Sequence, residues 1–268
     1  MTSAPIFGKS LGLDISTVVR IKIAAAAGLI LALGGCGTDE APGPLEPGAA
    51  GRVRFVNLIT DPARNPVNAI LEGVPFGVNL NYTGTTPSSL PAPATANYSA
   101  ILTGPRSMVL QRTAAPAVTV GTLSFTIAQS VDHTVYATGG TAGGPVGMFV
   151  TTDANPAPPV GQTAVRVVNM SPTAGAIDVF LTAVGADLAT ATPTISNLAY
   201  QGASAYLNVA AGTYRFRAVP AGTAPASRAT AVTINLASIV LPAGGRTFVT
   251  ADNNTGGAPL RAFVLPDR

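Results

Sequence analysis

The sequence of 268 residues contains no tryptophan, one histidine and one cysteine, and only 10% of its residues are charged. A single cysteine excludes an internal disulfide, so each folded domain must be held by its own hydrophobic core. A single histidine, His133, excludes a metal site built from several histidines, and no second cysteine is present to complete a zinc centre. No cofactor is therefore predicted.

Residues 23–33 form an apolar run that is too short to cross a bilayer, because a membrane-spanning helix needs about 20 apolar residues. Three basic residues precede the run and two glycines follow it, which is typical of a secretory signal peptide, here residues 1–35. The segment 33–36, Leu-Gly-Gly-Cys, resembles the lipobox of bacterial lipoproteins. The resemblance implies that the thiol of Cys36 carries a diacylglycerol and that the signal is removed before it. The open alternative is a free thiol inside an ordinary signal peptide.

The residue after Cys36 is Gly37. In enterobacterial sorting an aspartate at this position retains lipoproteins at the inner membrane, so by that resemblance Gly37 predicts anchoring by lipid at the outer membrane, on its periplasmic or its surface face. A single acyl chain binds a membrane only marginally. Stable anchoring therefore takes at least two chains, which a diacylglycerol supplies, and the resemblance implies that the new amino terminus is usually acylated as well.

Removal of the signal changes the charge of the protein. Lysine is absent after residue 22, and 12 arginines against 11 acidic residues leave the mature chain with a side-chain charge of +1. A nucleic-acid-binding protein needs a clustered basic face, whereas these arginines are scattered along the sequence. Nucleic acid is therefore not a predicted partner.

The mature chain repeats itself. Val-Arg-Phe-Val-Asn at 53–57 returns as Val-Arg-Val-Val-Asn at 165–169, and Asn-Leu-Asn-Tyr at 79–82 returns as Asn-Leu-Ala-Tyr at 197–200. Repeats this far apart indicate tandem domains rather than a solenoid.

Two further pairs, Thr134 with Thr247 and Tyr98 with Tyr214, extend the alignment. The repeat and the composition divide the chain into five parts. These are the signal peptide (1–35), a flexible tether (36–50), domain 1 (51–151), a proline-rich linker (152–162) and domain 2 (163–268).

Both domains carry the pattern of short strands. Apolar and polar residues alternate, as in Tyr214-Arg215-Phe216-Arg217, and turn-forming glycine and proline recur roughly every 8 to 12 residues. The predicted fold class is all-β, with two tandem immunoglobulin-like antiparallel β-sandwich domains; an antibody-type domain is excluded because it carries a tryptophan and a cysteine pair. The strands expected in domain 2 are 164–170, 176–181, 194–198, 205–209, 213–219, 230–236, 246–251 and 260–265.

Domain 2 resembles a known family. The segments that carry the resemblance are Val-Arg-Val-Val-Asn at 165–169, Ile-Asp-Val-Phe at 177–180, Asn-Leu-Ala-Tyr at 197–200 and Ala-Gly-Thr-Tyr at 211–214. Their succession resembles domain-of-unknown-function family 4397, over residues 163–268 well and over 51–151 less well, where Asn68 stands in place of Asp178. The resemblance implies secreted or lipid-anchored bacterial β-sandwich domains and brings no catalytic or ligand residue.

The sequence offers little for catalysis. His133 is available as a lone general base, but it aligns with Arg246, and a position that is arginine in the other domain indicates a solvated strand end. No Gly-x-Ser-x-Gly nucleophile elbow occurs at a strand-to-helix turn. Glycine pairs such as Gly139-Gly140 lack the lysine and the helix of a phosphate-binding loop. The protein is predicted not to be an enzyme.

A cluster of oxygen-bearing side chains is one candidate ligand site. Asp252, Asn253 and Asn254, with Asp153 and Asp267, offer oxygen ligands to calcium. Their spacing is not that of a calcium loop, so a polar turn is favoured and no metal site is predicted.

Tyr200, Tyr206 and Tyr214 are the candidate ligand-contact residues. Strand tyrosines can form a stacking surface for sugars or peptides, although packing in the core with the hydroxyl bonded to the backbone is favoured. Asp178 lies on the face opposite Ile177 and is expected to be solvated.

The predicted function is presentation of two β-sandwich domains, on a short lipid-anchored tether, for contact with a protein or an envelope polymer. The alternative is a lipoprotein that binds a carbohydrate or another small ligand, and a weaker alternative is an envelope hydrolase that uses His133 or paired carboxylates. The predicted partners are membrane lipid at Cys36 and an envelope protein or polysaccharide.

Overall fold

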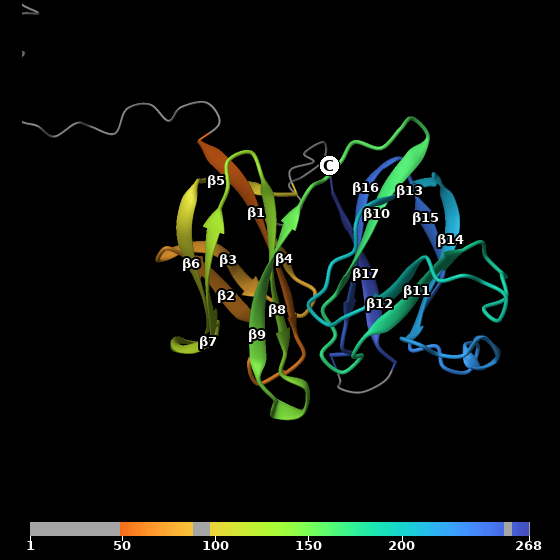
Figure 1. The fold of residues 1–268 in the computed structure, drawn as a ribbon. Helices are drawn as coiled ribbons and strands as arrows, with labels where there is room; N and C mark the ends of the chain where they lie inside the picture. The colour runs from red at the N-terminus through yellow and green to blue at the C-terminus, as the bar shows by residue number, and fades with distance from the viewer. Residues whose placement is uncertain (1–48, 88–96, 255–258, 268) are drawn as a thin grey trace, which may run out of the picture. The chain divides into compact units, whose positions relative to one another are not determined.

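The computed structural model describes residues 49–87, 97–254 and 259–267, all within one compact unit, Glu46–Arg268. These ranges are almost entirely β-structure, as predicted, with two short 3-10 helices, η1 (Thr141–Gly143) and η2 (Pro225–Ser227) (Figure 1). Cys36, the predicted lipidation site, lies outside the described residues.

Strands β1 to β9 form sandwich 1. Sheet A has the order β4-β1-β8-β9, with β5 also on β1, and sheet B has the order β3-β2-β6-β7. The strands are β1 (Ala50–Ile59), β2 (Val67–Leu71), β3 (Val74–Leu80), β4 (Thr85–Thr86), β5 (Ser99–Leu102), β6 (Gly104–Arg112), β7 (Ala115–Ile127), β8 (Asp132–Gly139) and β9 (Val146–Asp153).

Strands β10 to β17 form sandwich 2. Sheet C has the order β13-β10-β16-β17 and sheet D the order β12-β11-β14-β15. The strands are β10 (Gln162–Asn169), β11 (Ile177–Thr182), β12 (Ile195–Leu198), β13 (Leu207–Ala210), β14 (Gly212–Pro220), β15 (Ile234–Leu241), β16 (Gly244–Ala251) and β17 (Arg261–Pro266).

The eight strands expected in domain 2 are all present, with some ends shifted. The largest shift is in β15, which begins at Ile234 rather than at 230, because Ala231 still donates to Ser227 in the turn after η2. Strand β9 continues to Asp153, inside the segment predicted as linker.

The two sandwiches share one topology and one register. Val53 pairs with His133 as Val165 pairs with Arg246, which confirms the alignment of His133 with Arg246. Strand pairs are antiparallel throughout the described residues except for β1 with β8 and β10 with β16, which are parallel. A parallel pair needs a long crossover connection, and in each sandwich the chain between the two strands supplies it by passing through the opposite sheet.

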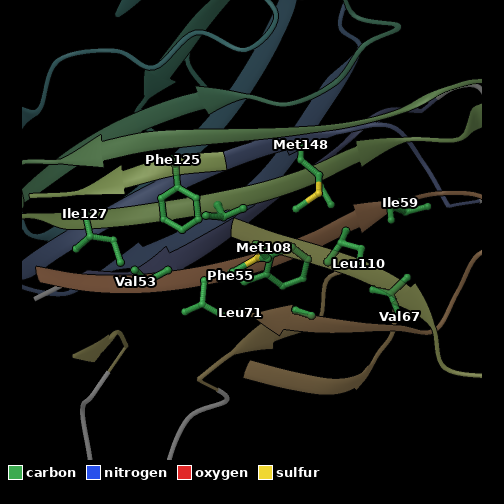
Figure 2. Packing of buried hydrophobic residues seen from close by; sticks show 13 residues of the cluster. Val53, Phe55, Ile59, Val67, Leu71, Met108, Leu110, Phe125, Ile127 and Met148 are labelled. Carbon is green, nitrogen blue, oxygen red and sulfur yellow. The ribbon is translucent and has the colours of Figure 1, made fainter. Parts of the chain in front are cut away.

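Each sandwich has its own core between its two sheets, formed by alternate residues of the facing strands. In sandwich 1 the core includes Phe55 of β1, Leu110 of β6 and Phe125 of β7, which point into the space between sheets A and B (Figure 2). In sandwich 2 the rings of Phe216 and Phe248 stack with centroids 4.7 Å apart.

A third apolar cluster joins the two sandwiches, so the expectation that each domain relies on its own core alone is wrong. The central strands of sheets A and C, β1, β8, β10 and β16, are buried on both faces, and the second faces of the two sheets pack on one another. The residues of this shared cluster are Val56, Leu58, Tyr136, Val168, Met170, Val249, Ala251 and Leu265.

Candidate functional site

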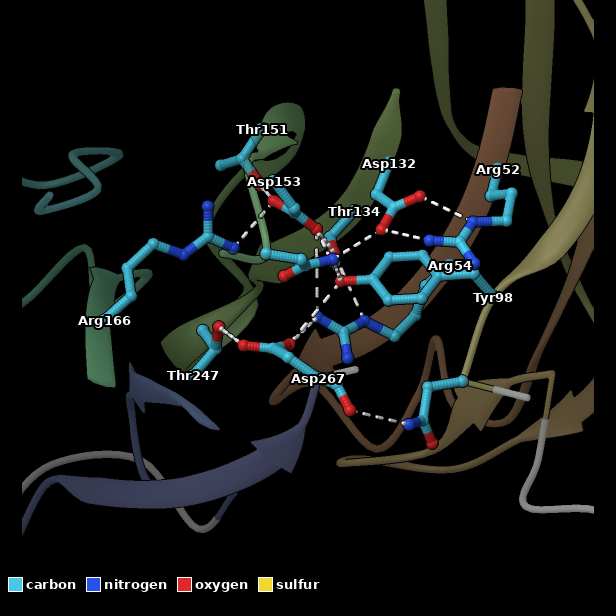
Figure 3. A network of polar contacts seen from close by, with 12 residues as sticks. Arg52, Arg54, Tyr98, Asp132, Thr134, Thr151, Asp153, Arg166, Thr247 and Asp267 are labelled. Atoms are coloured by element: carbon cyan, nitrogen blue, oxygen red, sulfur yellow. Dashed lines mark hydrogen bonds and ion pairs between the residues drawn. The ribbon is translucent and has the colours of Figure 1, made fainter. Parts of the chain in front are cut away.

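The arginine of each Val-Arg-x-Val-Asn repeat is buried between the sandwiches. Arg54 of β1 and Arg166 of β10 are each only 2% exposed. Arg54 Nη2 donates to Asp267 Oδ1 at 3.1 Å, and Arg166 Nη2 donates to Asp153 Oδ1 at 2.6 Å (Figure 3). Each arginine therefore binds the aspartate at the end of the last strand of the other sandwich.

Each arginine also donates to a backbone carbonyl of the other sandwich. Arg54 Nη1 donates to the carbonyl of Pro266 at 2.9 Å, and Arg166 Nη1 donates to the carbonyl of Thr152 at 3.2 Å. Each carbonyl belongs to the residue before the bound aspartate. The two halves of the contact are thus related by the internal duplication.

Two threonines hold the aspartates from their own sandwiches. Thr134 Oγ1 donates to Asp153 Oδ2, and Thr247 Oγ1 donates to Asp267 Oδ2 at 2.6 Å. Thr134 pairs with Arg54 across β1 and β8, as Thr247 pairs with Arg166 across β10 and β16. The predicted equivalence of the two threonines is therefore confirmed.

Two tyrosines cover the arginines. The guanidinium of Arg54 lies 4.4 Å from the ring centroid of Tyr98, and that of Arg166 lies 5.0 Å from the ring centroid of Tyr206, which is within the range of cation–π contacts. Tyr98 and Tyr206 are the residues before β5 and β13, so they are equivalent. The predicted alignment of Tyr98 with Tyr214 is wrong, because the sequence between the motifs differs in length.

The charges of this network balance, two arginines against two aspartates. Burial alone would lower the pKa of Arg54, but the neighbouring tyrosines and the carboxylates of Asp267 and Asp153 raise it. Burial raises the pKa of Tyr98 and of Tyr206. Both arginines are therefore charged and both phenols are neutral throughout the physiological range.

Sandwich 1 adds a further ion pair at the margin of the network. Arg52 binds Asp132 through two nitrogens, at 2.6 and 2.5 Å, and Asn155 Nδ2 donates to the same carboxylate at 2.6 Å. Asn155 Oδ1 accepts from the hydroxyl of Tyr206 at 2.6 Å. The segment between β9 and β10 is thereby tied to both sandwiches.

Tyr136 contributes a polar atom without a partner. Its side chain is fully buried in the shared cluster, and among the described residues its hydroxyl has no hydrogen-bond partner. Burial raises the pKa of Tyr136 to about 12, so the hydroxyl stays protonated. The cation–carboxylate network lies near it but does not bond it.

The tyrosine of each Asn-Leu-x-Tyr repeat also contacts the other sandwich. Tyr82 donates to the carbonyl of Asp252 at 2.6 Å, and the rings of Tyr200 and Phe149 of β9 make a T-shaped contact with centroids 5.9 Å apart. Both repeated motifs therefore place one side chain in the contact between the sandwiches.

The asparagine of each Val-Arg-x-Val-Asn repeat fastens the other motif. Asn57 Nδ2 donates to the carbonyl of Leu80 at 2.9 Å, and Asn169 Nδ2 donates to that of Leu198 at 3.0 Å. The two motifs recur together because the asparagine of Val-Arg-x-Val-Asn positions the turn that carries Asn-Leu-x-Tyr.

His133 and Asp178 are not solvated, contrary to expectation. His133 is 5% exposed, its Nε2 accepts from the amide of Ala128 at 3.3 Å, and burial lowers its pKa. Asp178 is 6% exposed and accepts from the amides of Asn197 and Gly222 at 2.8 and 3.0 Å. Both side chains therefore accept hydrogen bonds from backbone amides instead of facing solvent.

The polar residues weighed for calcium are separated. Asp153 and Asp267 belong to the ionic network, whereas Asp252 accepts from Thr173 Oγ1 at 2.7 Å and from Ser171 Oγ at 2.5 Å. Within the described ranges no group of three or more histidine, cysteine or acidic side chains is placed to hold a metal ion.

The three candidate ligand tyrosines take part in three different contacts. Tyr200 packs against Phe149, Tyr206 covers Arg166, and Tyr214 lies on the core of sandwich 2 with its hydroxyl donating to the carbonyl of Ala210 at 2.8 Å.

A hollow of about 430 Å³, groove 1, opens on sandwich 1 between the β2–β3 turn, β5 and the start of β6. Its volume is in the range of ligand sites, about 300–1,000 Å³. The apolar lining includes Leu71, Val74, Phe76, Ile101 and Leu102, and the charged residues at its margin are Glu72 and Arg106.

The hollow nearest to the equivalent place in sandwich 2 is much smaller. Leu181 and Val209 have the register positions of Leu71 and Ile101, and the hollow beside them holds only about 10 Å³. At the position of Arg106, sandwich 2 has Tyr214. The two sandwiches therefore differ in the volume that they leave open beside these residues.

No described helix combines the length and the hydropathy needed to cross a bilayer. No curated protein matches the sequence.

Solved structures of carbohydrate-binding modules show a distant likeness. A family 41 module from streptococcal virulence factors, described for α-glucan recognition, has 12% identity and a TM-score of 0.24 over 80% of this chain and 96% of that one. The family CBM26 module of Eubacterium rectale Amy13K, in complex with maltoheptaose, has 11% identity and a TM-score of 0.23 over 82% and 97%. Scores this low carry no argument about function.

One family model matches the sequence. Its match covers residues 51–180, which are sandwich 1, β10 and part of β11, and not chiefly domain 2 as the resemblance implied. The matched range contains Arg54, Asp153 and Arg166 of the network. Residues 51–180 match the model of the family described as domain of unknown function, DUF4397, which confirms the resemblance to that family.

Proposed function

We propose that the chain is a lipid-anchored protein of the bacterial outer membrane, without enzymatic activity, that presents its two sandwiches to a protein of the cell envelope. The observation that carries the binding role is the asymmetry of the duplicated pair: groove 1 holds about 430 Å³, whereas the hollow beside Leu181 and Val209 in sandwich 2 holds about 10 Å³. Packing alone gives no reason to keep one groove open. The carboxylates of the network are each held by arginine and threonine, which supports a structural role for them.

The anchor rests on Cys36 and the residues before it. We expect Cys36→Ala to release the protein from membrane fractions and to leave the signal uncut, with mass spectrometry showing a diacylglycerol on the wild-type terminus only. Gly37→Asp is the matched variant, because it keeps the lipid and is expected to move the protein to the inner membrane. A wild-type terminus without lipid would refute the anchor.

The binding role has its own test. Envelope fractions are cross-linked to the wild-type protein and to a variant with groove 1 blocked by Val74→Lys, a residue that is 65% exposed. The proposal requires a defined envelope protein that is cross-linked by the wild type and lost with the variant. Recovery of a polysaccharide in its place would favour the carbohydrate alternative.

A further inference from the structure

The edge of β5 borders groove 1. Apart from the carbonyl of Leu102, which accepts from Arg106, its outward backbone groups have no hydrogen-bond partner among the described residues. The amide of Thr103 donates to the carbonyl of Ala49, and residues along an antiparallel strand alternate in the side to which their backbone groups point. Ala100 and Leu102 therefore direct their backbone groups away from β1. Both residues also line groove 1.

An arginine marks one end of this edge. Arg106 Nη2 donates to the carbonyls of Leu102 and Thr103 at 2.7 and 3.0 Å, and Nη1 donates to its own neighbour, Pro105, at 2.8 Å. Among the described residues its hydrogen-bond partners are all carbonyls, and no carboxylate lies within ion-pair distance of it. Arg106 therefore brings a positive charge without an ion pair to the margin of an apolar groove, where the other charged lining residue, Glu72, accepts from the amide of Ser107.

The opposite edge of the groove is blunted. Strand β3 contains Pro75, which has no amide hydrogen, and the carbonyl of Phe76 accepts from Thr86 Oγ1 at 2.7 Å. Proline and capped carbonyls protect edge strands from pairing. A strand that enters the groove would pair with β5 and not with β3.

The equivalent strand edge in sandwich 2, that of β13, differs from the edge of β5. Tyr214 replaces Arg106, packs on the core and donates to the carbonyl of Ala210, the equivalent of Leu102. The edge of β13 is thus capped in the same way, but it has no positive charge and almost no hollow beside it.

We infer that groove 1 binds an extended peptide segment of a partner protein, which adds as a strand to the free edge of β5, inserts one apolar side chain among Leu71, Phe76 and Ile101, and places a carboxylate beside Arg106. Strand addition draws affinity from backbone hydrogen bonds and specificity from pockets for alternate side chains. The positive charge and the apolar lining set the chemistry of the segment, an apolar residue near an acidic one. This inference deepens the proposed function and rests on it.

The test uses the full chain, purified in detergent, and a panel of capped fluorescent hexapeptides. Each peptide has Thr at its background positions, one of Val, Ile, Leu or Phe as the apolar residue, and a Glu one, two or three positions later. We expect binding by at least one peptide, measured by fluorescence anisotropy, with slowed hydrogen exchange at the amides of Ala100 and Leu102. Replacing Glu by Gln, or methylating the backbone nitrogen next to the apolar residue, is expected to weaken binding at least tenfold.

The variants separate groove 1 from the rest of the surface. Arg106→Tyr installs the residue of sandwich 2, and Val74→Lys blocks the mouth; each should lower affinity at least tenfold. Arg215→Tyr is the control: it also replaces an arginine by tyrosine, but on sandwich 2, and it should leave the affinity for the peptide unchanged. Unfolding curves check that each variant folds. If Arg106→Tyr does not fold, the affinity of Val74→Lys tests the inference.

Three outcomes would overturn the inference: no peptide in the panel binds, the N-methylated peptide binds as tightly as its parent, or Val74→Lys binds like the wild type. Binding of maltoheptaose in place of every peptide would also overturn it. The anchoring and cross-linking experiments are independent of the panel. A protein that is anchored and cross-links its partner but binds no peptide refutes this inference and leaves the proposed function standing.

Discussion

Arg54 of the first strand and Asp267, beyond the last strand, are joined by a hydrogen bond of 3.1 Å between Nη2 and Oδ1. The two residues come from different sandwiches and are almost fully buried. The bond has an equivalent between Arg166 and Asp153. From contacts of this kind, in which each sandwich supplies a partner to the other, we expect the two sandwiches to unfold as one unit.

Arg54→Met is expected to lower the free energy of unfolding by about 3–5 kcal/mol, because it leaves the carboxylate of Asp267 buried without its cation. The double variant Arg54→Met, Asp267→Asn should lose less than the sum of the two single losses. Denaturant unfolding measures all three. Arg261→Met, at an exposed position on β17, is the control and should change stability by less than about 0.5 kcal/mol. Additive losses would show that the pair is not coupled.

Tyr136→Phe is expected to raise the free energy of unfolding by about 1 kcal/mol, because it removes a buried hydroxyl that has no partner among the described residues. Tyr98→Phe is the matched variant. It deletes a hydroxyl that donates to Asp153 Oδ2 at 2.9 Å, so it should have the opposite sign. Thermal and denaturant unfolding of the two variants check the prediction, and destabilisation by both would contradict it.

Stability should depend on pH through His133. Burial lowers the pKa of this imidazole in the folded state below the ordinary value of 6.5. The unfolded chain therefore binds the proton first as the pH falls, so stability is lost from about pH 6.5 downward and is constant above about pH 7.5. His133→Gln should remove the loss between pH 7.5 and 5.5, while Arg246→Gln, the equivalent change in sandwich 2, should retain it. An unchanged pH profile in His133→Gln would rule this histidine out.

The duplication and the strands could be read from the sequence, because both depend on local patterns. The repeat at 53–57 and 165–169 is close to identical, and alternation along β14 gives the period of a strand directly. The parallel pairing of β1 with β8 could not be read, since a strand's side-chain pattern does not tell which neighbour it takes or in which direction.

The network was missed although its signal was present. Arginine stands in both copies of the motif, and a charged residue repeated between apolar neighbours indicates a buried pair. What the sequence withholds is the partner, because Asp153 and Asp267 lie outside both motifs and bind across sandwiches. The misplaced pairing of Tyr98 with Tyr214 has the same origin: only the register of β5 and β13 shows that Tyr206 is the equivalent residue.

Separated sandwiches are expected to be unstable. A chain that ends after residue 159 would expose Val56 and Leu58 of the shared cluster and leave Arg54 without Asp267. Exposed apolar faces of this kind promote association, and an unpaired buried charge is costly. Size-exclusion chromatography should show self-association or aggregation of each half, and calorimetry of the intact chain should show one unfolding transition. Two resolved transitions, or a soluble monomeric half with native stability, would mean that the bonds of Arg54 and Arg166 to the other sandwich do not couple the folding of the two sandwiches.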